Sequence, residues 1–219
     1  MNIVSIITGD FIDSKKLIFE EKETLINLLE SLSRDLFHIS KSKTEIFRGD
    51  SFQIRVDDPL QSLRFAIALR ALVRKNTFVD SNRQWDVRLS LGLGNIEFEK
   101  DHIGSSDGEA YRNSGYGLDE MKKNRLSIKV PNPEITRDWQ VSTAFADDII
   151  SNWTIKQSVA MYQKLISNTT HEEIAKKLNV RRQTVDKLLK SAKEPLIEFF
   201  IHRFEEYTNQ LITKSLQND

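Results

Sequence analysis

Two aspartates stand where they could hold a metal ion. Asp10 follows an apolar run at the N-terminus, and Asp50 lies in the turn Arg48-Gly49-Asp50-Ser51 between two extended segments. If the first strand pairs with this hairpin, the two carboxylates converge at one end of a sheet. Mg²⁺ takes few protein oxygens and keeps its other positions for water or phosphate, so an aspartate pair suits it as a cofactor site. The spacing equally allows a helix cap at Asp10 and an ordinary turn residue at Asp50.

A short polar and basic stretch follows Asp10. Ser14, Lys15 and Lys16 are expected at the start of the first helix, where backbone N–H groups and lysine charges receive phosphates. Nucleotidyl-transfer enzymes place a metal ion between paired carboxylates and substrate phosphates. The N-terminal region therefore suggests a site for Mg²⁺ together with a nucleotide or another phosphate ligand.

The sharpest motif lies between residues 170 and 193 and predicts a helix-turn-helix. Ala175 is the small residue needed where two helices touch, and Asn179, four residues later, tolerates a left-handed turn. Thr170 and Glu173 form a Ser/Thr-x-x-Glu capping box for the first helix. This pattern predicts a module of the kind that places its second helix in the major groove of DNA.

The second helix of this motif would present polar and basic side chains suited to base edges and phosphates. We predict that six of them contact DNA: Arg181, Arg182, Gln183, Thr184, Lys187 and Lys190. Residues 171–193 hold seven Lys and Arg against three Asp and Glu, a local charge of +4. The alternative is that these charges are only the solvated face of a helical hairpin.

Periodicity predicts the elements that must position these residues. Up to about residue 95 the order is strand, helix, strand, strand, helix, strand, from apolar patterns at 3–7, 17–40, 44–47, 52–56, 59–74 and 87–93. This is the split βαβ or ferredoxin-like order, with two helices on one face of an antiparallel sheet. Gly92-x-Gly94 lacks the third glycine of a dinucleotide fingerprint and is interpreted as strand packing.

The remaining pattern divides the chain into two expected domains. A loop at 102–108, a helix at 109–123, a strand at 126–130 and a helix at 135–152 complete an α+β domain over 1–152. A supporting helix at 155–166, the helix-turn-helix and an apolar tail at 195–212 form an all-α domain over 153–219. The tail is too apolar for a lone helix in water, so it packs within the monomer or forms a homodimer with a second copy.

Composition excludes several classes of protein. The 219 residues contain 32 Lys and Arg, 32 Asp and Glu, and no cysteine, which rules out disulfide scaffolds, thiolate zinc sites and cysteine nucleophiles. No apolar stretch is long enough to span a membrane and the N-terminus does not resemble a signal peptide, so we expect a cytoplasmic protein with no membrane partner. The zero net charge combines +4 over residues 171–193 with −4 elsewhere.

Three strings carry a resemblance to a known family. IITGDFIDSK, FRGDSFQI and GLGNIEFEKDHIGSSDGEAYRNSGYGLDEMKK resemble the SatD family and, more distantly, the catalytic palms of class III nucleotide cyclases and GGDEF proteins. The resemblance covers roughly residues 3 to 130, and SatD-like chains carry a helix-turn-helix behind this region. It implies that Asp10 and Asp50 are the two metal ligands.

Two departures from the cyclase pattern shape the functional prediction. Ser51 stands where GGDEF enzymes have a carboxylate, and Asn113 is followed four residues later by Gly117, so no Asn-x-x-x-Arg pair is present to stabilise a transition state. The sequence therefore favours a DNA-binding transcriptional regulator whose cyclase-like domain binds a nucleotide or phosphate ligand. The alternatives are a Mg²⁺-dependent enzyme acting on nucleoside triphosphates and a non-catalytic protein-interaction adaptor.

Overall fold

The computed structural model describes the chain except residues 1–2, 48–49, 79–82, 99–105, 168 and 218–219. Its strands are β1 (Ile3–Phe11), β2 (Ser42–Phe47), β3 (Ser51–Val56), β4 (Val87–Phe98), β5 (Asp107–Gly108) and β6 (Leu126–Lys129). Its helices are α1 (Phe19–Asp35), α2 (Ser62–Lys75), α3 (Glu109–Asp119), α4 (Pro133–Ser151), α5 (Ile155–Ile166), α6 (His171–Leu178), α7 (Arg182–Ser191) and α8 (Glu194–Gln217), with 3₁₀ turns η1 (Ser14–Lys16) and η2 (Pro59–Gln61). The expected turn residues Arg48 and Gly49 and part of the loop predicted at 102–108 lie outside the described residues.

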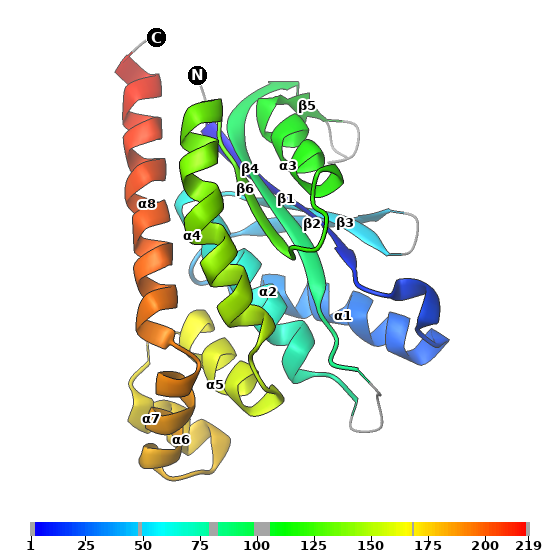
Figure 1. Ribbon diagram of the computed structural model, residues 1–219, viewed down its shortest axis with the longest axis vertical. Helices are drawn as coiled ribbons and strands as arrows, with labels where there is room; N and C mark the ends of the chain where they lie inside the picture. The colour runs from blue at the N-terminus through cyan, green and yellow to red at the C-terminus, as the bar shows by residue number, and fades with distance from the viewer. Residues whose placement is uncertain (1–2, 48–49, 79–82, 99–105, 168, 218–219) are drawn as a thin grey trace.

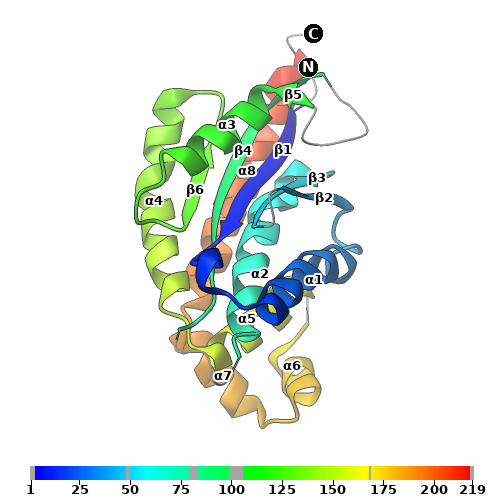
Figure 2. The same ribbon diagram turned by 90° about the vertical axis from the view of Figure 1, so that its right-hand side faces the viewer.

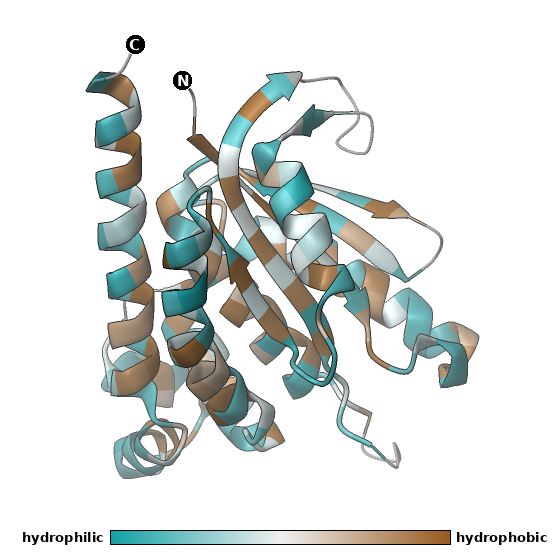
Figure 3. Cartoon of the chain, turned by 45° about the horizontal axis from the view of Figure 1, so that its top comes forward, coloured by the Kyte–Doolittle hydropathy of each residue, from teal (hydrophilic) through white to brown (hydrophobic). Residues whose placement is uncertain are grey.

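The sheet places β1 at its centre. The strand order is β2-β3-β1-β4-β5, with antiparallel pairing along this path. Strand β6 pairs in parallel with β4 on the far side from β1 (Figure 1). The chain follows the predicted succession of strands and helices as far as β4. Because β1 is covered on both faces, it needs the nearly continuous apolar run of its sequence rather than strict alternation. Along β4, by contrast, apolar and more polar bands alternate (Figure 3).

The two faces of the sheet carry different helices. Ile7 and Phe11 of β1 belong to the large core that also holds buried residues of α1 and α2, whereas Val4 and Ile6 pack with Ala110 of α3 on the opposite face. Helix α3 comes close to β4 because glycines face it. A Cβ on Gly92 would lie 2.4 Å from the Ala110 carbonyl oxygen, and one on Gly94 would lie 2.7 Å from the Ala110 nitrogen. The strand-packing interpretation of these glycines is confirmed.

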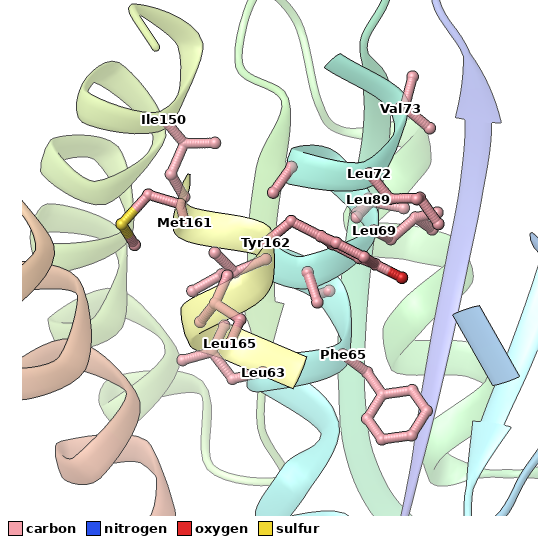
Figure 4. Packing of buried hydrophobic residues seen from close by; sticks show 14 of the residues in the cluster. Leu63, Phe65, Leu69, Leu72, Val73, Leu89, Ile150, Met161, Tyr162 and Leu165 are labelled. Carbon is pink, nitrogen blue, oxygen red and sulfur yellow. The ribbon is translucent and has the colours of Figure 1, made fainter. Parts of the chain in front are cut away.

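Helix α5 packs against α2, so side chains on both sides of residue 152 share one core. Met161, Tyr162 and Leu165 of α5 are buried beside Leu63 and Leu69 of α2 (Figure 4). The division at 152/153 falls between α4 and α5 in the chain. The division into an α+β domain over 1–152 and an all-α domain over 153–219 stays a prediction.

The C-terminal helix α8 runs beside α4 (Figure 1). The two helices meet through aromatic side chains. The Trp139 ring of α4 lies edge-on to Phe200, Phe204 and Tyr207 of α8, at centroid distances of 5.8 to 5.9 Å. Phe200, Phe204 and Tyr207 of the apolar tail therefore pack within the monomer, whereas Leu196 and Phe199 are exposed. The homodimer stays a prediction. Within the described residues, no helix combines the length and the hydropathy needed to cross a membrane.

Candidate functional site

The register of the central strands brings the two predicted aspartates to one end of the sheet. Asp10, the penultimate residue of β1, is paired with Ser51 of β3 on one side and with Arg88 of β4 on the other. The Phe11 backbone N–H donates to the carbonyl oxygen of Asp50 at 3.1 Å, which fixes the hairpin turn against the end of β1. Both aspartates line one open cavity of about 510 Å³.

Arg88 holds Asp10 through a two-pronged ion pair. Its Nε donates to Oδ1 of Asp10 at 2.8 Å, and its Nη2 donates to Oδ2. The hydrogen bond to Asp10 raises the pKa of the Arg88 guanidinium above its ordinary value, although partial burial works against the charge. Such fork geometry fixes both side chains, so Asp10 is oriented by β4 as well as by its own strand.

Asp50 is oriented by Ser14, one of the predicted phosphate-binding residues. The Ser14 hydroxyl donates to Oδ2 of Asp50 at 2.6 Å. One expectation about this segment is wrong: Ser14, Lys15 and Lys16 form the isolated turn η1, and α1 begins only at Phe19. The Lys16 N–H donates to the Asp13 carbonyl at 2.8 Å and the Leu17 N–H to the Ser14 carbonyl at 3.3 Å, so these two N–H groups are already bonded within the turn.

The cavity is more basic than the sequence predicted. Among the residues that the structure describes, three carboxylates and six cations line it: Asp10, Asp13, Asp50, Lys15, Lys16, Arg88, Lys122, Lys123 and Arg125. Sequence reasoning missed the last four cations. Lys122 and Lys123 were assigned to a helix, but α3 ends at Asp119 and the Lys122–Arg125 segment is the loop that enters β6. The run Lys-Lys-Asn-Arg before a strand was the available signal.

A buried network of charges positions Arg125 at the cavity wall. Its Nη1 donates to Oδ2 of Asp86 at 2.9 Å, and the side chain of Asp86 is only 1 % exposed. Asp86 also accepts from Arg70 and Arg74 of α2 at 2.7 Å each. Burial opposes the charge on Asp86, but the arginines outweigh it and hold the pKa of this carboxyl below its ordinary value. A cation anchored in this way keeps its place whether or not a ligand is bound.

The donor set fits a magnesium ion. Among the described residues, no group of three or more metal-binding side chains comes together. Mg²⁺ does not need one, because it commonly binds one or two carboxylates and completes its shell with water and phosphate. Each oxygen of Asp10 accepts one bond from Arg88, and a carboxylate offers about four lone-pair sites, so Asp10 retains acceptor capacity. Asp10 and Asp50 would hold the ion, with Arg88 competing for Asp10.

Asn113 and its neighbour Arg112 on α3 are both bonded to groups outside the cavity. The Asn113 amide donates to the Leu93 carbonyl at 2.8 Å, and Arg112 pairs with Glu97 and with Asp107. Neither Arg112 nor Asn113 is among the residues that line the cavity. Any positive charge that stabilises reacting phosphates must therefore come from the cavity's own lysines and arginines.

The predicted DNA-contacting residues lie together on a second surface, formed by α7. Asn179 has the expected left-handed conformation, with φ of 52°, and the Thr170–Glu173 capping box is present. Val185 and Leu189 on the other side of α7 are buried. All six predicted side chains are exposed: Arg181, Arg182, Gln183, Thr184, Lys187 and Lys190. Helices α6 and α7 occupy the end of the molecule opposite β5 and the end of α8 (Figures 1 and 2).

Comparison with known proteins gives similarities only among solved structures. No family model matches the chain, and no curated protein matches it. The active GGEEF domain of a diguanylate cyclase from Vibrio cholerae aligns with 60% of this chain and 84% of that one, at 15% identity and a TM-score of 0.43. The guanylyl cyclase Cya2 aligns with 63% of this chain and 77% of its own, at 12% identity and a TM-score of 0.40. A bacterial light-regulated adenylyl cyclase aligns with 64% of this chain and 81% of its own, at 14% identity and a TM-score of 0.38.

No residue role is transferred from these structures at such identities and TM-scores. The resemblance to the SatD family likewise stays a prediction, since no family model matches. The roles assigned below rest on the residues of the cavity and on their contacts.

Proposed function

We propose that the chain is a Mg²⁺-dependent enzyme that binds a nucleoside triphosphate in the cavity at the end of β1. The observation that supports this proposal most directly is the composition of that cavity. It gathers Asp10 and Asp50 beside six cations drawn from η1, β4 and the loop before β6. A polyphosphate chain needs several cations at once, and a magnesium ion needs the carboxylates.

The cavity residues divide into three roles. Asp10 and Asp50 hold the ion, which neutralises developing charge on phosphate oxygens and orients them when it is bound. Arg88 and Arg125 direct their remaining N–H donors at phosphate oxygens, since Arg88 also binds Asp10 and Arg125 also binds Asp86. The flexible lysines add point charges at the rim: Lys15, Lys16, Lys122 and Lys123.

Phosphoryl and nucleotidyl transfer require little covalent chemistry from the protein. Positioning and electrostatic stabilisation account for most of the rate enhancement in such reactions, and this cavity supplies both. This proposal makes the enzyme, rather than the ligand-binding regulator, the primary function of the N-terminal region. The sequence has no cyclase-type Asn-x-x-x-Arg pair to stabilise the transition state. In its place, the cations of β4 and of the 122–125 loop stabilise the charge on the phosphates.

Product analysis tests the enzyme directly. The full chain is incubated with each of the four nucleoside triphosphates and Mg²⁺ or Mn²⁺, and products are separated by ion-exchange chromatography. Turnover that Asp10→Asn abolishes supports the proposal. Absence of turnover with every nucleotide and both metals would remove the enzyme and leave a binding domain.

A second function is favoured by the exposed surface of α7. We propose that α6 and α7 are a helix-turn-helix that binds DNA, because all six predicted contact residues are exposed, five on the short helix α7 and Arg181 directly before it. Asp186 lies on the same helix and pairs with His171 at 2.6 Å and with Arg182 at 3.8 Å, so it reduces the positive charge there. A homodimer would allow two copies to contact paired half-sites.

A gel-shift titration of the full chain on genomic fragments tests this second function. Binding should weaken steeply as salt rises, since each displaced phosphate counterion contributes to the slope. Arg181→Ala combined with Arg182→Ala should weaken binding at least tenfold, whereas Lys214→Ala, an exposed cation near the far end of α8, should not. Equal binding by all three proteins contradicts a DNA-binding role for α7.

A further inference from the structure

A groove of about 660 Å³ between α4 and α8 gathers exposed apolar side chains. Three large apolar residues that line it are mostly exposed: Phe145, Leu196 and Phe199, at 70%, 57% and 65%. Val141, one turn before Phe145 on α4, is 63% exposed as well. Exposed apolar clusters of this kind mark a surface that binds another molecule. Neither the proposed nucleotide site nor the α7 surface uses this groove, called here the α4–α8 groove.

The two helices of the groove run side by side in opposite directions, which sets which of their residues lie at one level (Figure 1). The Trp139 ring contacts three aromatic rings of α8 between positions 200 and 207, so position 139 of α4 is level with the middle of that range. Phe145 lies about 9 Å further along α4, and Phe199 lies about 7 Å in the same direction along α8, at about 1.5 Å per residue. The two exposed phenylalanines therefore stand at nearly the same level on opposite walls of the groove.

The groove also carries one charge of each sign, at the level of Trp139. Asp138 lines it from α4, and Arg203 lines it from α8. Among the described residues no ion pair engages Asp138, and Arg203 pairs with Glu206 of its own helix. That pair contributes little because both side chains are exposed, and a guanidinium has five N–H donors, so Arg203 can bind a further carboxylate.

These positions make the groove complementary to a second copy of itself. In a two-fold interface, each contact between one residue and another occurs twice. If the two-fold axis runs parallel to the helices, α4 of one copy lies on α8 of the other, and residues at one level meet. Asp138 then faces Arg203 of the second copy, and Phe145 faces Phe199 of the second copy. An apolar centre flanked by two opposite-charge pairs is the composition that homodimer interfaces favour.

The face formed by α4 and α8 is large enough for such an interface. Helix α4 has 19 residues and is therefore about 28 Å long, and two adjacent helices are about 20 Å wide. Covering this face on both copies buries about 1,100 Å², slightly above the ~1,000 Å² that a specific interface needs. An area at this lower end fits a dimer that dissociates in the micromolar range.

We propose that the chain forms a homodimer through the α4–α8 groove, in which two copies build a four-helix interface about a two-fold axis parallel to these helices. The inference goes beyond the proposed function, and its test needs neither nucleotide nor DNA. Helix α8 begins three residues after α7 ends, so the dimer would hold two α7 surfaces in one assembly.

Sedimentation velocity of the full chain over a range of concentrations measures its self-association. We expect a dimer with a Kd in the micromolar range. Phe145→Glu and Phe199→Glu each place a charge in the apolar centre, and each should raise this Kd at least tenfold. Phe19→Glu is the matched control, because Phe19 is 74% exposed and lies outside the groove, and it should leave the Kd unchanged. Circular dichroism checks that each variant is folded.

Charge reversal tests how the two copies are arranged. Asp138→Lys and Arg203→Glu each bring like charges together at two places in the dimer, and each should raise the Kd about tenfold. An equimolar mixture of these two variants should associate nearly as tightly as the unmodified chain, because opposite charges then meet at both contacts. A change confined to one copy cannot produce this recovery.

Several outcomes would overturn the inference while leaving the proposed function intact. A chain that stays monomeric at every concentration shows that the groove does not bind a second copy, and a foreign apolar partner would then be its occupant. A dimer that Phe145→Glu and Phe199→Glu leave unchanged uses another surface. Charge-reversal variants that dimerise like the unmodified chain, or a mixture of them that fails to associate, would contradict the proposed two-fold arrangement.

Discussion

The ion pair between Arg88 and Asp10 should compete directly with a bound metal ion. Arg88 donates two hydrogen bonds to the Asp10 carboxylate, one to each oxygen. Hydrogen bonds to charged groups contribute about 1.5–3 kcal/mol, and the lower end applies here because the Arg88 and Asp10 side chains are 36% and 17% exposed. Weakening this pair should therefore tighten metal binding by roughly tenfold, which corresponds to about 1.4 kcal/mol.

Titration with Mn²⁺, followed by the loss of its free-ion EPR signal, measures this effect without nucleotide. Arg88→Gln removes the fork and its charge, whereas Arg88→Lys keeps the charge and removes only the second bond. We expect about tenfold tighter Mn²⁺ binding for Arg88→Gln and a smaller gain, still above threefold, for Arg88→Lys. Lys123→Gln removes a charge from the same cavity without touching Asp10 and serves as the control.

Lys123→Gln separates the effect of the Arg88 fork from that of charge alone. Equal gains for Arg88→Gln and Lys123→Gln would show that only the overall charge of the cavity matters. No gain for either arginine variant would show that Asp10 is not a metal ligand. The account requires the order Arg88→Gln, then Arg88→Lys, then Lys123→Gln.

Three further predictions concern stability, each measured by urea unfolding. Asp86→Asn should destabilise the fold by about 3–5 kcal/mol at pH 7, because it removes the carboxylate that pairs with buried Arg74 and leaves buried Arg70 with Asp147. The folded pKa of Asp86 lies below its ordinary 3.8, so its contribution is present above that pH and is lost below it, and the variant should show a flatter acid limb. Gly92→Ala should destabilise by about 1–3 kcal/mol, since the new methyl meets α3 backbone 2.4 Å away; a neutral result would mean that α3 can move. Trp153→Phe should destabilise by about 1–3 kcal/mol, because it removes the 2.8 Å bond to the Ala192 carbonyl and leaves that buried group unpaired; an unchanged free energy of unfolding would show that water replaces the indole.

The sequence predicts those parts of the fold that depend on residues close together in the chain. Alternation of Phe52, Ile54 and Val56 with polar neighbours identified β3, and all three side chains are buried. Asn179 and the Thr170 capping box identified the α6–α7 turn for a similar reason, because each acts within a few residues of its own position.

The parts of the site that sequence missed depend on contacts between distant segments. Arg88 reaches Asp10 across 78 positions, and only the register of β1 against β4 places them together. Lys122 and Lys123 were assigned to a helix because charged residues fit a helical surface as well as a loop. Arg70 and Asp86 are charged residues, a type usually found on the surface, yet they are only 0% and 3% exposed. Pairing between distant segments determines whether such residues are buried, and a local sequence pattern does not show this pairing.

Calorimetric titration of the full chain with a β,γ-imido nucleoside triphosphate and Mg²⁺ measures whether the cavity at the end of β1 binds nucleotide. We expect saturable binding for at least one of the four bases. Lys123→Gln combined with Arg125→Gln should weaken nucleotide binding at least tenfold. In Asp10→Asn, the nucleotide affinity should no longer depend on whether Mg²⁺ is present. Absence of binding for every nucleotide, or binding that none of these substitutions alters, would contradict a nucleotide site in this cavity.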